Sequence, residues 1–229
     1  MLKHIPNLLT ISNLICGCIA LYFVFHENLI LAAYLIGLAA IFDFMDGAAA
    51  RILNVSSPVG KELDSLADLI SFGLVPGAFV FHLLEASALN HLAFLALLIP
   101  AFSALRLAKF NVDERQTDYF IGLPTPANCL LFVSLPLITH YQDESFVAMW
   151  IEIPELLIGL TILSSIALVS ELPLFSLKFK NLSYQENQLR FFFIGISGLL
   201  LALLQFSAIP IIVVLYLILS LIFRQREVN

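Results

Sequence analysis

The sequence predicts an all-α polytopic membrane protein with about eight transmembrane helices. Three observations lead to this fold class. Hydrophobic residues make up 60% of the 229 positions. Only 12% of the residues are charged, whereas soluble domains carry about 25%. Apolar runs long enough to cross a bilayer follow one another with short connections, so we expect a single transmembrane domain over residues 1–229.

The expected spans begin close to the N-terminus. The first apolar run is longer than a signal-peptide core of about 7–15 residues, and no A-x-A-like site follows it, so we expect a retained helix. At the other end, residues 191–223 could form one long helix, but Ser207 to Pro210 offers a break, which favours a helical hairpin over 191–224. The candidate spans are residues 8–26, 29–53, 60–84, 92–110, 125–141, 154–171, 191–207 and 209–224.

Basic residues predict the orientation of these spans. With eight spans and a cytoplasmic N-terminus, all 11 basic residues fall at or near cytoplasmic helix ends, and the opposite loops contain none. Both termini are therefore expected in the cytoplasm, whereas a seven-span chain would leave Arg224 and Arg226 outside. The other basic residues are Lys3, Arg51, Lys61, Arg106, Lys109, Arg115, Lys178, Lys180 and Arg190.

Four aspartates interrupt the second and third spans, in the segment DFMDGAAARILNVSSPVGKELDSLAD at residues 43–68. Asp43 and Asp46 share one helix face, Asp64 and Asp68 share a face of the next helix, and the turn at residues 56–60 lets the pairs face each other. An acid at the bilayer centre costs about 2.5–3.5 kcal/mol. We therefore expect a pair of divalent cations, and carboxylate oxygens favour Mg²⁺ or Mn²⁺ over zinc. Solvated loop acids or helix caps are the alternative, which the apolar flanks disfavour.

The pattern D-x2-D-G-x2-A-R-x8-G-x3-D-x3-D in this segment resembles the signature of the CDP-alcohol phosphatidyltransferase family, and every fixed position matches. The resemblance implies an enzyme of phospholipid biosynthesis in which an alcohol attacks the pyrophosphate of a CDP-activated lipid and CMP leaves. It also implies a catalytic core at about residues 1–171. Asp43 and Asp46 would hold one metal ion, Asp64 would bridge both, and Asp68 would bind the second and act as general base. The residues alone do not decide which acid is the base.

The same resemblance implies contacts to the CDP-lipid. The implied residues are Asn7, Thr10, Gly47, Arg51 and Ser57. Four of these residues have a simpler interpretation. Asn7 and Thr10 could cap a helix that starts near Pro6, Arg51 could be an interfacial anchor, and Gly47 could serve helix packing alone.

Further segments resemble the membrane-embedded bacterial and archaeal members of this family that make phosphatidylserine. They are IPNLLTISNLICG, DSLADLISFGLVPGA, RLAKFNVD and FIGLPTPAN, within residues 4–130. The implied substrates are CDP-diacylglycerol and L-serine, and the implied location is a prokaryotic inner membrane. Arg106 and Lys109, three residues apart, are expected to hold the serine carboxylate, and Ser71 is expected to orient serine or the base. The alternatives are positive-inside anchors for the basic pair and a helix-packing hydroxyl for Ser71.

Two other functions compete with this prediction. Glycerol 3-phosphate or inositol phosphate could be the acceptor, but we would expect more basic residues near the site for such anionic substrates. A divalent-cation transporter would need polar residues at matching depth on several helices, whereas the acids gather at one membrane face. We expect a homodimer, membrane-lipid contacts and two metal ions, with no organic cofactor. No basic stripe indicates nucleic-acid binding, and Cys16, Cys18 and Cys129 lack zinc-site or CxxC spacing.

Overall fold

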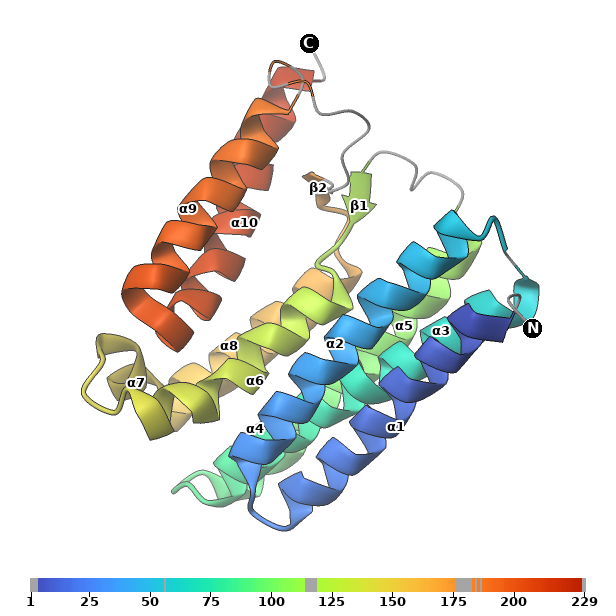
Figure 1. Ribbon diagram of the computed structural model, residues 1–229. Helices are drawn as coiled ribbons and strands as arrows, with labels where there is room; N and C mark the ends of the chain where they lie inside the picture. The colour runs from blue at the N-terminus through green and yellow to red at the C-terminus, as the bar shows by residue number, and fades with distance from the viewer. Residues whose placement is uncertain are drawn as a thin grey trace.

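The computed structural model describes residues 4–55, 57–113, 119–175, 183, 185 and 187–227, with the backbone alone for residues 119, 120 and 223–227. Within these residues the chain is almost entirely helical, which confirms the predicted all-α class (Figure 1). Each of the eight expected spans has a helical counterpart. Some basic residues used to predict orientation lie outside the described part. They are Lys3, Arg115, Lys178 and Lys180, together with the side chains of Arg224 and Arg226.

The first two spans form an antiparallel pair, α1 (Ile5–Phe25) and α2 (Leu29–Ile52), which pack along their length. A tight turn joins them. Glu27 has a φ of 60° there, and the side chain of Asn28 caps α2 by accepting a hydrogen bond from the Leu31 amide. Alanines fill the contact between the helices, because Ala20, Ala32 and Ala39 are completely buried. The packing of this pair brings the polar face of α1 close to the aspartates of α2.

The third span is continuous from residue 58 to residue 85 but changes its helical pitch in the middle. It consists of α3 (Pro58–Asp68), the π-helix η2 (Leu69–Leu74) and α4 (Val75–Glu85). Ser57 caps α3, and Pro58 occupies the first turn, where a missing amide hydrogen costs nothing. The π-helix packs closely on α1, since a Cβ at Gly17 would lie 3.0 Å from Ser71 Cα.

Helix α6 is the central helix of the bundle. A 3₁₀ segment, η3 (Asn90–Leu97), leads into α5 (Leu98–Val112), and α6 (Thr125–Tyr141) follows. Residues 131–138 of α6 are all buried, and α6 contacts α2, α4, α8 and α10. The short helix α7 (Phe146–Ile151) then connects α6 to α8 (Pro154–Val169). One small sheet accompanies them. In it, β1 (Tyr119–Ile121) pairs antiparallel with β2 (Pro173–Phe175), an addition that the sequence did not predict.

The last apolar stretch is divided into two helices, α9 (Gln188–Leu204) and α10 (Ala208–Glu227). They lie side by side in Figure 1 and contact each other. The 3₁₀ turn η4 (Gln205–Ser207) separates them, and Gln205 has a φ of 49°. Gln142 holds this turn, because its side chain donates to the Leu204 carbonyl and accepts from the Ser207 amide. The helix break thus lies a few residues earlier than the sequence predicts.

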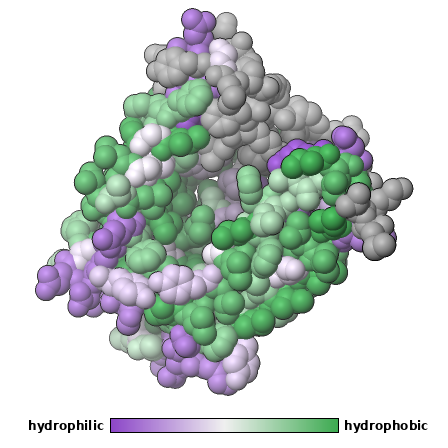
Figure 2. All heavy atoms as spheres, in the orientation of Figure 1, coloured by the Kyte–Doolittle hydropathy of each residue, from purple (hydrophilic) through white to green (hydrophobic). Residues whose placement is uncertain are grey.

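Apolar side chains cover the sides of the bundle. In Figure 2 hydrophobic residues dominate the visible face, and hydrophilic residues gather near the ends of the helices. Large side chains such as Phe44, Phe94 and Leu163 are about 70% exposed, as expected for a lipid-facing surface. The stretches long and apolar enough to cross a membrane are residues 5–25, 29–52, 58–85, 90–112 and 188–222. The chain is a polytopic membrane protein.

Candidate functional site

Three aspartates from two helices meet near one end of the bundle. Asp43 comes from α2, and Asp64 and Asp68 come from α3. One carboxylate oxygen of each lies within 4.8 Å of the others, and we call these three residues the acidic cluster. Asp68 is buried and the other two are half-buried. Three carboxylates this close repel one another unless a cation lies among them, and an all-oxygen set fits Mg²⁺, Mn²⁺ or Ca²⁺. The acidic cluster therefore fits a divalent cation.

Asp46 lies one turn beyond Asp43 on α2 and is directed towards α1. Its Oδ2 atom accepts a 2.6 Å hydrogen bond from the hydroxyl of Thr10, which also lies 3.0 Å from the Pro6 carbonyl oxygen. A hydrogen bond to a carboxylate this short is of the strong, charge-assisted kind. Thr10 therefore fixes the orientation of Asp46, whose side chain is 7% exposed.

Asn13 is a residue of this site that the sequence analysis missed. It is completely buried, and its Nδ2 atom donates to Asp68 Oδ1 at 3.3 Å. Its Oδ1 atom has no hydrogen-bond partner within the described residues. A signal was present, because Asn7, Thr10 and Asn13 recur at intervals of three along an otherwise apolar helix and so share one face.

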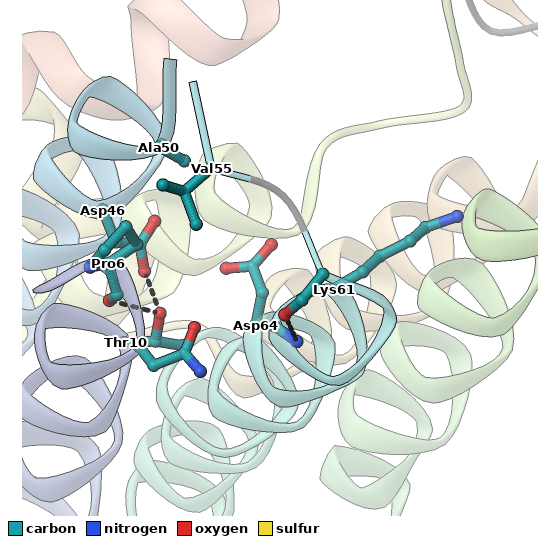
Figure 3. A pocket seen from close by; sticks show the side chains of 11 residues that line it. Pro6, Thr10, Asp46, Ala50, Val55, Lys61 and Asp64 are labelled. Atoms are coloured by element: carbon teal, nitrogen blue, oxygen red, sulfur yellow. Dashed lines mark hydrogen bonds between the residues drawn. The ribbon is translucent and has the colours of Figure 1, made fainter. Parts of the chain in front are cut away.

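A cavity of about 210 Å³ opens beside Asp46 and Asp64, between the first turns of α1, the end of α2 and the start of α3. Figure 3 shows both carboxylates at this cavity, with Thr10 and Pro6 on the side of α1. The lining residues are Pro6, Asn7, Thr10, Asp46, Gly47, Ala50, Val55, Ser57, Gly60, Lys61 and Asp64. Four of the five residues predicted to contact the CDP-lipid are among them.

Arg51, the fifth of these residues, is exposed and lies next to the cavity. Its Nη1 atom is 3.7 Å from the position that a Cβ of Gly47 would occupy, so the guanidinium lies over this glycine. Gly60 allows a close approach of α3 to α1, because a Cβ there would lie 3.1 Å from Asn7 Oδ1 and from Ser57 Oγ. The guanidinium of Arg51 and several hydrogen-bonding groups therefore surround the opening of this cavity.

The capping alternative for Asn7 and Thr10 is wrong. Helix α1 begins at Ile5, with His4 as its N-cap residue and no side-chain capping hydrogen bond. Asn7 and Thr10 therefore lie inside the helix. Ser57, by contrast, does cap α3, since its Oγ accepts a 3.0 Å hydrogen bond from the Gly60 amide.

Lys61 lines the cavity, but its charge is directed elsewhere. Its Nζ atom donates a 2.7 Å hydrogen bond to the Asn111 carbonyl near the end of α5. Figure 3 shows its side chain extending away from Asp46 and Asp64. The Asn111 side chain in turn donates to Ser65 Oγ at 2.9 Å. These bonds hold the ends of α3 and α5 together.

The three residues predicted to bind serine lie in different surroundings. Arg106 is buried, donates from Nη1 to Thr125 Oγ1 at 3.2 Å, and lies 5.8 Å from the ring centroid of Phe110. Lys109 is exposed, so the two basic side chains differ in their surroundings. Ser71 is completely buried, and its hydroxyl donates to the Asn13 carbonyl at 3.1 Å, as a helix-packing hydroxyl would.

The chain is similar to known proteins. Three of the relatives that are named CDP-diacylglycerol–serine O-phosphatidyltransferase illustrate this similarity. The one from Bacillus subtilis is 38% identical over 139 residues, 58% of this chain and 76% of the relative. The one from Helicobacter pylori J99 is 28% identical over 220 residues, covering 95% and 89%. The one from Methanocaldococcus jannaschii is 36% identical over 163 residues, covering 71% and 72%. The family model for CDP-alcohol phosphatidyltransferase matches residues 3–170, and the chain therefore belongs to the CDP-alcohol phosphatidyltransferase family.

Proposed function

We propose that the chain is a CDP-diacylglycerol–serine O-phosphatidyltransferase, which transfers the phosphatidyl group of CDP-diacylglycerol to L-serine and releases phosphatidylserine and CMP. The observation that carries this proposal is the position of the acidic cluster beside a cavity that Asp46 and Asp64 line, in a membrane-embedded bundle. The relatives named above carry this activity in their names. A second acceptor, glycerol 3-phosphate or inositol phosphate, remains an outcome of the test.

Two divalent cations, Mg²⁺ or Mn²⁺, belong to the proposal. Bound at the four aspartates, they would neutralise the pyrophosphate and polarise the phosphorus for attack. The short distances in the acidic cluster and the partnerless Oδ1 of Asp64 support ligation there. Asp46 is the fourth proposed ligand, held by Thr10.

The CDP moiety is proposed to occupy the cavity between α1, α2 and α3. Asn7, Thr10 and Ser57 offer hydrogen-bonding groups on its wall. Gly47 leaves room for close approach to the backbone. Arg51, whose guanidinium lies over Gly47, would bind phosphate oxygens with two parallel hydrogen bonds. The diacylglycerol chains would then extend into the surrounding lipid.

Asp68 is proposed as the general base. It takes the proton of the serine hydroxyl, the serine oxygen forms a bond to the phosphorus that carries diacylglycerol, and the bond from this phosphorus to the CMP oxygen breaks. Asn13 restricts the orientation of Asp68 by a hydrogen bond from its side chain. Of the predicted serine contacts, we retain Arg106, because Lys109 is exposed and the hydroxyl of Ser71 is bonded to the backbone of α1.

The proposal also includes the setting of the enzyme. We propose a prokaryotic inner-membrane protein that acts as a homodimer, with both termini in the cytoplasm. Arg51, Lys61 and Lys109 lie on helix ends close to the acids, as a cytoplasmic site requires. The catalytic core would be about residues 1–171, and the α9–α10 hairpin over residues 191–224 would be an addition to it, because the family match ends at residue 170.

Release of CMP from CDP-diacylglycerol by the purified, detergent-solubilised protein tests the proposal. The acceptors compared are L-serine, glycerol 3-phosphate, inositol phosphate and none. We expect CMP and phosphatidylserine with L-serine alone. Turnover with one of the phosphorylated acceptors in place of serine would correct the acceptor, whereas the absence of CMP with every acceptor would overturn the reaction.

A further inference from the structure

A buried cation lies in the bundle and has few polar contacts within the described residues. Arg106 is 7% exposed, and its Nε atom has no hydrogen-bond partner within the described residues. Its contacts are the hydroxyl of Thr125 and the ring of Phe110. Asp68 and Tyr216 lie within electrostatic reach of Arg106, and the proposed function already uses Asp68 at the metal site. A buried guanidinium in such surroundings is stabilised by an anionic ligand.

A buried amide without a partner lies on the neighbouring helix. Asn128 is completely buried, and both its Nδ2 and its Oδ1 atoms lack a partner in the described part of the chain. It lies three residues after Thr125 on α6, and so on the same helix face as the residue that contacts Arg106. A buried amide without hydrogen bonds is unfavourable, which indicates a ligand or water for it.

A hydroxyl on α5 completes the group. Ser103 is completely buried, its Oγ atom has no described partner, and it lies one turn before Arg106. It packs on the π-helix, since a Cβ at Gly73 would lie 3.0 Å from Ser103 Cβ. On the side of α6, Cys129 Sγ contacts the Ser71 carbonyl at 3.7 Å. The two helices therefore flank the π-helix that begins directly after Asp68.

We propose that Arg106, Asn128 and Ser103 form the acceptor site, which recognises the head of an α-amino acid. This inference rests on the proposed function, and it specifies how the enzyme selects serine. Arg106 binds the carboxylate, Asn128 Oδ1 accepts from the ammonium, Asn128 Nδ2 donates to the carboxylate, and the Ser103 hydroxyl donates to a carboxylate oxygen. The zwitterion of an α-amino acid thus provides an ionic or hydrogen-bond partner for each of these groups. A phosphate monoester lacks an ammonium and would leave Asn128 Oδ1 without a donor.

The test compares Asn128→Leu with the wild type in a CMP-release assay, with each substrate varied in turn. Leucine keeps the volume and removes both hydrogen-bonding atoms. We expect the KM for L-serine to rise about 10- to 100-fold, as for a lost hydrogen bond to a charged group, and the KM for CDP-diacylglycerol to change less than about twofold. The wild type should also prefer L-serine over 3-hydroxypropionate, which lacks the ammonium, and the variant should lose most of that preference.

Ser134→Ala is the matched control, because Ser134 is equally buried on α6 but its hydroxyl donates to the Leu131 carbonyl of its own helix. It should leave both KM values unchanged. If Asn128→Leu does not fold, Asn128→Ser gives the same comparison with a smaller side chain. A variant that keeps the wild-type KM for serine, or raises both KM values equally, would overturn the acceptor site alone. A wild type that does not use serine would overturn the proposed function as well.

Discussion

The acidic cluster and the acceptor site both place polar groups inside an apolar bundle, but their charges are opposite in sign. The acidic cluster gathers three carboxylates, which destabilise one another until cations bind. The acceptor site combines one guanidinium with neutral groups that have no hydrogen-bond partner among the residues that the structure describes. The first arrangement requires positive ligands, and the second requires a ligand with a negative end and a hydrogen-bond donor. The sign of the local charge thus separates the proposed metal site from the proposed acceptor site.

The two groups also differ in their access to solvent. The acidic cluster adjoins a cavity of about 210 Å³ through Asp64. The partnerless atoms of Arg106, Asn128 and Ser103 expose almost no area. Perturbing the first region should therefore affect the reaction itself, whereas perturbing the second should affect mainly the affinity for the acceptor. Four predictions test this difference.

Removal of divalent cations should have the largest effect. Chelation should abolish CMP release, because the pyrophosphate would face four uncompensated carboxylates. Mg²⁺ or Mn²⁺ should restore activity, and zinc should not, because carboxylates and water are ligands suited to the harder ions. Measurement of CMP release in metal-depleted buffer, with each ion added back separately, tests this prediction. Full turnover without metal would remove the proposed role of the acidic cluster.

Asp68→Asn should lower kcat by about 10² to 10⁴, the usual contribution of a general base. Loss of a metal ligand would add to this effect. Binding of CDP-diacylglycerol should remain mostly intact, because the cavity is formed by other residues. Single-turnover kinetics and a separate binding measurement distinguish the two quantities. A nearly normal rate would move the base to another acid, with Asp64 as the next candidate.

Arg106→Ala should raise the KM for serine about 10- to 100-fold, because serine alone would lose its carboxylate partner. The KM for CDP-diacylglycerol should change much less. Lys109→Ala is the matched control, since Lys109 lies one turn away on α5 and is exposed, so little change is expected. Equal effects of Arg106→Ala on both KM values would place Arg106 at the pyrophosphate or in helix packing instead.

Thr10→Val should have the smallest effect of the four. It removes the hydroxyl that donates to Asp46 Oδ2 and keeps the size and branching of the side chain. Loss of such a group behind a metal ligand costs about 10- to 100-fold in metal affinity or activity, and we expect the lower value. The Mg²⁺ concentration for half-maximal activity should rise while the KM for serine stays constant. A change confined to the serine KM would contradict the separation of the two regions.

The sequence predicted the parts of the fold and site that depend on regular spacing. Hydropathy placed the helical segments, and the aspartates were evident because charges are rare in apolar runs. The division of the last stretch near Ser207 was also predicted, since Pro210 follows it closely. The family resemblance singled out residues of α1, of α2 and next to α3 that prove to line one cavity.

Neutral polar residues were harder to assign. Asn13 and Asn128 carry no charge that would reveal a site, and buried serines and asparagines also occur as packing groups in membrane helices. Their importance depends on which atoms lack partners, which only the tertiary structure shows. The different burial of Arg106 and Lys109 was missed for a related reason. Residues three apart share a helix face only roughly, and the neighbouring helices decide which of them is covered.

The geometry of the site depends on the number of residues in the π-helix Leu69–Leu74 as well as on the identity of the site residues. A π-turn is equivalent to one residue inserted into an α-helix, so it rotates α3 by about 100° relative to α4. This offset lets Asp64 and Asp68 face Asp43 while Val75 and Phe79 of α4 stay in the apolar core. Deleting one residue between 69 and 74 would keep every aspartate and the hydropathy of the span, and would still turn the acids away from α2. Single-residue insertions and deletions here would thus alter the enzyme more than many substitutions.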